Sequence, residues 1–167
     1  DFIDEPVDLG FDCPLDLHCS YTREQLLVAM DFMKPSIVRE GVKWLPDKNI
    51  DVFFITLNKS DKDYSPTTMY QDYSINETLF HWQSQSTTNA EGKVGQRYIN
   101  HRKNGSKVLL FVREFKNDIY GNTAPYTYLG TANYVSHNGS RPMNITWKLD
   151  DPIPAKYLKK TNKLVVG

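Results

Sequence analysis

The chain has 167 residues, with 20 basic and 20 acidic side chains, and it is 40% apolar and 13% aromatic. This composition is sufficient for one domain with a core of ordinary size. The sequence contains neither a signal peptide nor an apolar run near 18 residues, so we expect a cytoplasmic protein without a membrane partner. Because the chain begins with Asp1 rather than Met, we expect it to be a piece of a longer protein.

Charge is unevenly distributed along the chain. Residues 1–20 hold six acids and no Lys or Arg, which leaves 14 acids and 20 bases, a balance of +6, in the remainder. We therefore interpret residues 1–20 as an acidic linker or covering strap and residues 21–167 as the domain. A mildly basic domain is compatible with contacts to DNA phosphates, and equally with solvated surface charge.

The first predicted element is a helix that begins after Thr22. Thr22 and Gln25 have the spacing of a capping box, and the helix should run to about Phe32, since Pro35 cannot continue it. Further helices are expected at 95–103 and 154–160, with a single helical turn at 65–68. The strands expected in chain order span 41–45, 50–57, 79–85, 107–115, 126–137 and 143–149.

This order of elements is not a regular alternation of strand and helix. It predicts an α+β fold, with two or three helices flanking a twisted, barrel-like mixed sheet.

Enzyme motifs in the chain are incomplete. His101 begins the H-x-K-x4-D pattern of phospholipase-D-type nucleases, but the position of the final acid holds Val108. Glu114 and Lys116 have the E-x-K spacing of metal-dependent nucleases, without a well-placed upstream Asp. The sequence has neither a phosphate-binding G-x-x-x-x-G-K-[ST] loop nor a G-x-S-x-G elbow. We expect a binding domain without catalysis, metal or cofactor.

Residues 70–85 combine aromatic and hydrogen-bonding side chains. On a strand, His81 and Gln83 share one face while Phe80 and Trp82 share the other. A base swung out of a duplex needs flat surfaces on both sides and polar groups along its edge, and a carboxylate can accept from the cytosine N4 amine. The alternative is a strand whose aromatics fill the core while its Gln side chains face water.

The segments 51–57, 70–73, 79–88, 95–99, 124–130 and 140–143 resemble one bacterial family, and the resemblance covers about residues 15–160. The family is the C-terminal domain of SauUSI-like type IV restriction enzymes, which carry a phospholipase-D-type nuclease and a DEAD-box helicase and cleave DNA that contains 5-methylcytosine. The resemblance implies a recognition domain for methylated duplex DNA, with 5-hydroxymethylcytosine as a further ligand. Its other partners would be the helicase and nuclease domains of the parent chain, where ATP and a divalent metal would act.

Residues 69–73 and 79–84 also resemble, without a gap, the two stretches of SRA domains that enclose a flipped methylcytosine. The resemblance implies stacking by Tyr70 and Trp82, although the family's acid position holds Tyr73 and Asp72 lies one residue early, so Gln83 or Gln85 is an alternative reader of the base edge. The base pocket would comprise Tyr70, Asp72, Tyr73, Trp82, Gln83, Ser84 and Gln85. The loop 86–94 would enter the duplex, and the DNA-contacting residues would be Lys59, Lys62, Asn89, Lys93, Arg97, Arg102, Lys103 and Arg141.

Three other functions stay open at this point. A PUA-like fold of the same type could bind RNA instead of duplex DNA. The domain could be a structural module that couples a motor to a nuclease. It could also be a separate metal nuclease that uses Glu114 and Lys116.

Overall fold

The computed structural model describes residues 15–32, 41–58 and 72–161. Within them the helices are α1 (Arg23–Ala29), α2 (Lys93–Ile99) and α3 (Ala155–Thr161). The strands are β1 (Ser20–Tyr21), β2 (Val42–Leu45), β3 (Ile50–Asn58), β4 (Tyr73–Ser74), β5 (Leu79–Gln83), β6 (Lys107–Phe115), β7 (Tyr126–Asn138) and β8 (Asn144–Leu149). None of these helices is long and apolar enough to cross a lipid bilayer.

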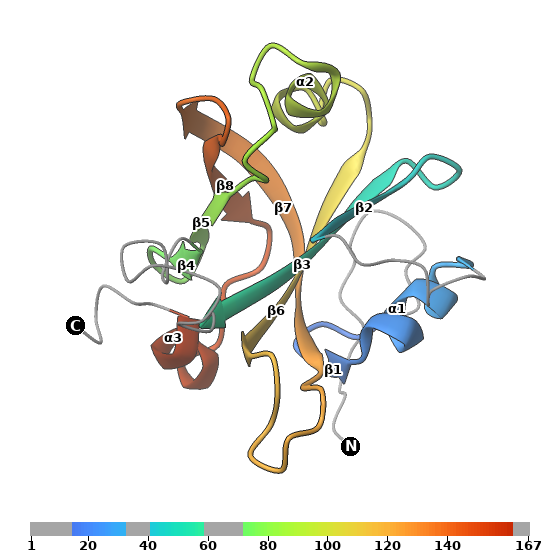
Figure 1. Ribbon diagram of the computed structural model, residues 1–167, viewed down its shortest axis with the longest axis vertical. Coiled ribbons are helices and arrows are strands. Elements are labelled where there is room, and N and C mark those ends of the chain that lie inside the picture. Colours follow the sequence, from blue (N-terminus) through green and yellow to red (C-terminus); the bar gives the residue numbers. More distant parts are fainter. Residues whose placement is uncertain (1–14, 33–40, 59–71, 162–167) are drawn as a thin grey trace.

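The strands form one mixed sheet in the order β2-β3-β6-β7-β8-β5-β4, with β1 added alongside β7. Only β3 and β6 are paired in parallel; the other pairs in the described part of the chain are antiparallel. Figure 1 shows the long β7 curving through the molecule, with α2 at one end and α1 and α3 on different sides. The predicted α+β class is confirmed, and the described strands form an open sheet with β2 and β4 at its edges.

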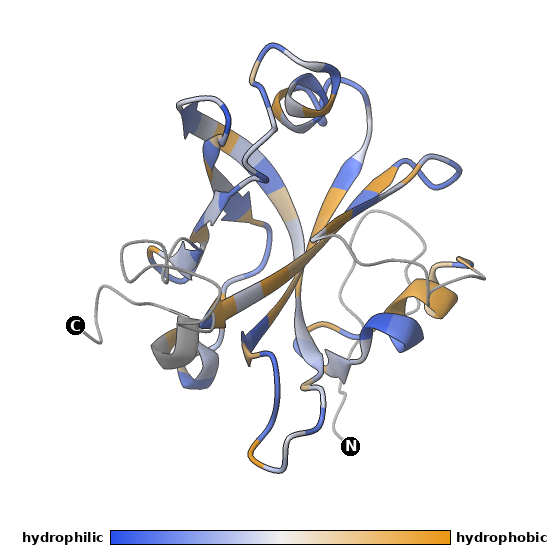
Figure 2. Ribbon diagram, viewed as in Figure 1, coloured by the Kyte–Doolittle hydropathy of each residue, from blue (hydrophilic) through white to orange (hydrophobic). Residues whose placement is uncertain are grey.

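Two hydrophobic cores lie on opposite faces of the central strands. Phe53 and Leu110 face the larger core, which includes Trp147, whereas Phe54 and Phe111 face a second core covered by α1. Because β3 and β6 are buried on both faces, they carry nearly continuous apolar runs, which Figure 2 shows as orange strands at the centre. These runs explain why both strands could be predicted closely, and β6 matches its predicted bounds.

Residues 15–21 lie against the domain rather than apart from it. The backbone of His18 donates to the carbonyl of Tyr128, and the amide of Tyr128 donates to the carbonyl of Cys19. Leu15 is buried in the second core. Residues 15–21 are therefore packed along β7.

The helices differ from their predicted bounds for local reasons. The Thr22–Gln25 capping box is present, but α1 ends at Ala29 because Asp31 adopts a positive φ of 65° and the chain turns away. The second helix spans 93–99 instead of 95–103, since the backbone after it folds back so that Ser106 donates to the carbonyl of His101. The predicted turn at 65–68 lies outside the described residues.

Candidate nucleic-acid interface

The alternation predicted for the segment 79–85 is present in β5, and the aromatic face points inward. Trp82 is only 5% exposed, and its ring centroid lies 4.4 Å from Phe53 and 5.6 Å from Tyr98. This differs from the prediction that Trp82 stacks on a flipped base. The physical reason is that β3 and α2 supply aromatic partners, which already cover the indole on the core side.

The outer face of β4 and β5 carries a different aromatic pair. The rings of Tyr73 and His81 are stacked with centroids 4.8 Å apart, and both side chains are half-buried. Next to them, Gln83 donates from Nε2 to Oδ1 of Asn144 on β8. This face therefore places two stacked rings beside amide groups, and these are the kinds of side chain that base stacking and edge recognition use.

The side chains of two further pocket residues, Asp72 and Ser84, form hydrogen bonds within the protein. The buried carboxylate of Asp72 accepts from the backbone amide of Gln83 at 2.8 Å and so ties the entry of β4 to the end of β5. Ser84 Oγ accepts from the amide of Met143 and donates to the carbonyl of Gln85. The amide of Met143 is thus bound by a side chain instead of a backbone carbonyl, and β5 ends at Gln83 rather than at Gln85, whose side chain is exposed. Tyr70 lies outside the described residues.

The loop after β5 is joined to the turn between β7 and β8. Ser140 Oγ accepts from the amide of Ala90 and donates to Oδ1 of Asn89, while the amide of Arg141 donates to the carbonyl of Thr88. The side chain of Asn89 therefore holds the loop against the turn between β7 and β8. This differs from the prediction that Asn89 contacts DNA. A Cβ on Gly95 would lie 2.2 Å from the carbonyl oxygen of Asn89, so α2 approaches this loop as closely as glycine allows.

Arg97 has a buried partner within the protein. Its guanidinium forms two hydrogen bonds of 2.8 and 2.9 Å with Asp51, which is fully buried, and it also lies 4.6 Å from the ring centroid of Trp44. Burial alone would lower the pKa of Arg97, but the hydrogen bonds that it donates to Asp51 and the negative charge of that carboxylate outweigh burial and raise the pKa. Arg97 was predicted to contact DNA, but in the structure its side chain connects α2 to Asp51 on β3.

The remaining predicted cations gather at one end of the molecule. We define the basic lobe as residues 84–107 and 138–143, two segments distant in sequence that the Asn89–Ser140 bond connects. It contains six bases and one acid, a formal balance of 6 − 1 = +5, and one of the six bases, Arg97, is paired with Asp51 outside these segments. The bases are Lys93, Arg97, Arg102, Lys103, Lys107 and Arg141, and the acid is Glu91.

The side chains of Lys93, Lys103 and Arg141 are exposed. Arg102 is also exposed but donates to the carbonyl of Tyr134. Lys59 and Lys62 lie outside the described residues. The lobe thus presents several cations to solvent on a framework held by hydrogen bonds.

His101 anchors the basic lobe to β7. The ring is buried, its Nδ1 lies 3.2 Å from the carbonyl of Ser106, and its Nε2 accepts from the amide of Tyr134 at 3.0 Å. These two contacts require a neutral imidazole protonated on Nδ1, and burial lowers the pKa of His101. The sequence reveals neither this role of His101 nor the partners of Asp51 and Ser140, because each depends on contacts between segments that are distant along the chain.

Glu114 and Lys116 form the incomplete nuclease motif of the sequence. Glu114 lies near the end of β6 and is partly buried, whereas Lys116 is exposed. Across the ranges that the structure describes, no three His, Cys, Asp or Glu side chains are grouped so that they could hold a metal ion.

The chain is similar to one protein family over most of its length. No curated protein matches the chain. One family model matches residues 15–160, the segment that contains both cores and the basic lobe. The chain therefore belongs to the family described as a domain of unknown function (DUF3427).

Proposed function

We propose that this domain binds duplex DNA through the basic lobe and serves as the module that recognises 5-methylcytosine in a larger restriction enzyme. The observation that carries the proposal is the joining of two basic segments, 84–107 and 138–143, into one hydrogen-bonded surface. In this proposal the sheet and its flanking helices are a variant of the SRA/PUA-like fold, and the domain itself is not an enzyme.

The charge of the basic lobe supports backbone binding. Exposed Lys and Arg that neutralise DNA phosphates release counterions, which gives affinity that falls as salt rises. Such contacts position the protein without reading sequence. The exposed residues Gln85, Ser86 and Thr87 lie at the outer part of the loop that leads into α2. In the proposal this loop enters the duplex while the cations on either side hold the phosphates.

Base recognition is assigned to the outer face of β4 and β5. The Tyr73–His81 stack would contact one face of an extruded cytosine, and Gln83 and Asp72 lie beside it. Trp82 would support this strand from the core side. A methyl group buried in an apolar niche contributes about 0.8 kcal/mol, so the preference for methylated DNA should be modest, about fourfold, unless flanking bases are also read.

The first experiment is fluorescence anisotropy with two duplexes of one sequence, with and without 5-methylcytosine, over a range of salt concentrations. We expect tighter binding to the methylated duplex at every salt concentration. Lys93→Ala and Lys103→Ala should each weaken binding to both duplexes and reduce the slope of log affinity against log salt by about 0.9, the value for one phosphate contact. Lys116→Ala is the matched control, since this exposed lysine lies outside the basic lobe.

The possible outcomes distinguish DNA binding by the basic lobe from recognition of 5-methylcytosine. Equal affinity for both duplexes, with the expected slopes, would leave a DNA-binding domain and refute recognition of methylcytosine. Slopes unchanged in both lysine variants would refute the basic lobe as the interface. Preference for RNA over duplex DNA would favour the PUA-like alternative, and no binding to any nucleic acid would favour a structural coupling module.

A further inference from the structure

The connection between β6 and β7 is an ordered hairpin loop. Oδ1 of Asp118 accepts from the amides of Tyr120 and Asn122, each at 2.9 Å, and Asn117 forms a β-bridge with Thr123. Gly121 has a φ of 84°, which suits the tight turn. Hydrogen bonds from two backbone amides to the carboxylate of Asp118 therefore brace the tip of this loop.

Two large apolar side chains project from that tip. Ile119 is 90% exposed and Tyr120 is 82% exposed, the highest values among the large hydrophobic residues that the structure describes. In Figure 2 the tip appears as an orange segment in an otherwise polar loop, at the end of the molecule opposite α2. An exposed aromatic residue on a rigid loop is typical of the central residues of protein interfaces.

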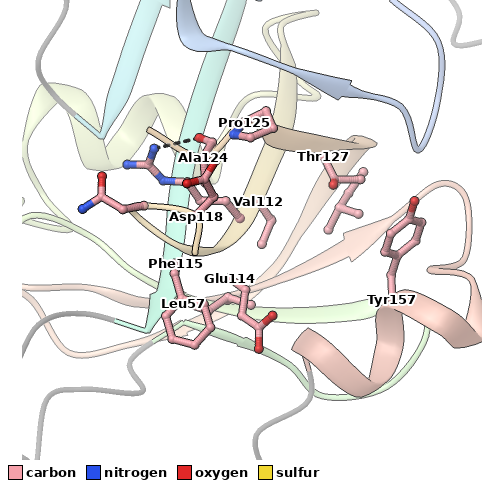
Figure 3. Close-up of a pocket in the computed structure, with 12 residues that line it drawn as sticks. Leu57, Val112, Glu114, Phe115, Asp118, Ala124, Pro125, Thr127 and Tyr157 are labelled. Atoms are coloured by element: carbon pink, nitrogen blue, oxygen red, sulfur yellow. Dashed lines mark hydrogen bonds between the residues drawn. The ribbon is translucent and has the colours of Figure 1, made fainter. Parts of the chain in front are cut away.

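A cavity lies beside the base of the same loop. Its volume is about 230 Å³, and Figure 3 shows it between the ends of β3 and β6, the start of β7, and Tyr157 on α3. Leu57, Val112 and Leu129 form apolar walls, and half-exposed Phe115 lies at the rim. Pockets for drug-sized ligands usually measure about 300–1,000 Å³, so this cavity has the size for a single large side chain.

Glu114 supplies a polar group in this cavity. In Figure 3 its side chain extends into the space between Phe115 and Tyr157. No described residue donates a hydrogen bond to its carboxylate or forms an ion pair with it. The adjacent Arg113 is engaged elsewhere, with Nε donating to Thr56 and a terminal nitrogen donating to the carbonyl of Ala124. A carboxylate beside apolar walls gains most from a ligand that brings both an apolar body and a hydroxyl donor.

We propose that the occupant is Tyr120 of a second copy of this chain. Its ring would fill the cavity against Phe115, and its hydroxyl would donate to Glu114. Because the projecting tyrosine and the cavity lie on the same part of the surface, two copies related by a twofold axis can each insert a tyrosine into the other, as an isologous interface requires. The contact is remote from the basic lobe, so dimerisation leaves the proposed DNA surface exposed.

The test is sedimentation velocity of the full chain between about 1 µM and about 1 mM, the range in which weak interfaces associate. We expect a concentration-dependent monomer–dimer equilibrium. Tyr120→Ala should raise the dimer dissociation constant about tenfold or more, as removal of a central interface tyrosine does. Val135→Ala is the control, since Val135 is a half-exposed apolar residue on β7, outside the loop and the cavity. A chain that remains monomeric at every concentration would overturn the proposal, as would a dimer unaffected by Tyr120→Ala.

A second set of variants tests the contact between the two residues. Tyr120→Phe and Glu114→Gln each keep the size of the side chain and change the hydrogen bond. If Tyr120 donates to Glu114, the double variant should lose much less affinity than the product of the two single losses. Losses that simply multiply would refute this pairing. Because both variants preserve volume and Tyr120 is exposed, circular dichroism should show unchanged folding.

Discussion

Replacement of Trp82 by alanine distinguishes a core residue from a base-stacking residue. The indole is 5% exposed and contacts Phe53 and Tyr98 in edge or tilted geometry. Removal of a buried Trp costs about 3–5 kcal/mol, which includes the cavity left behind. For a chain of this length each kcal/mol lowers Tm by about 2–4 °C, so we expect a decrease of about 6–20 °C.

The comparison variant is Tyr73→Ala on the outer face of the same strand pair. Tyr73 is half-buried on the short strand β4 and contacts His81, so its removal should cost about 1 kcal/mol of stability. If it stacks on an extruded base, its loss should instead weaken binding to methylated DNA by about 1–3 kcal/mol. The two variants should therefore show opposite patterns of stability and binding.

The assay combines thermal unfolding by circular dichroism with anisotropy measured well below the Tm of each variant. We expect Trp82→Ala to lower Tm strongly while the folded protein retains its preference for methylated DNA. A Trp82→Ala protein with nearly unchanged Tm and no methyl preference would refute the assignment of Trp82 to the core. It would restore the stacking role inferred from the SRA resemblance.

Two further predictions concern buried charged and titratable groups. Arg97→Ala leaves the fully buried Asp51 without its partner and should lower the free energy of unfolding in urea by about 3–5 kcal/mol. The slope of log affinity for DNA against log salt should stay unchanged. A shallower slope in the folded variant would show that Arg97 contacts DNA. Burial lowers the pKa of His101, so the unfolded chain takes up a proton near pH 6.5 while the native chain resists it. Stability is therefore fully present above about pH 6.5 and should fall as the pH decreases below that value. Urea unfolding across this range should show a weaker pH dependence in His101→Gln, and an equal dependence would exclude His101 as its source. Burial also lowers the pKa of His18, with the same sign, so some dependence should remain in this variant.

Much of the secondary structure could be predicted from local patterns. The buried strands β3 and β6 are marked by apolar runs, and α1 begins at the Thr22 capping box. The bounds of α2 could not be predicted, because its end depends on the hydrogen bonds that draw His101 toward β7. The elements that could be predicted depend on residues close together in the sequence. The helix end that could not be predicted depends on a contact with another part of the fold.

The sequence by itself determined which side chains of β5 share a face, since alternation along a strand is a local property. Only the tertiary structure decided that the Trp82 face is the buried one, because Phe53 and Tyr98 come from β3 and α2. The same holds for Arg97, which pairs with Asp51 on β3. It also holds for the basic lobe, which exists because Ser140 binds the loop at Asn89. The sequence determines whether a side chain is charged or aromatic. Whether that side chain is available to a ligand depends on which residues from distant segments already contact it.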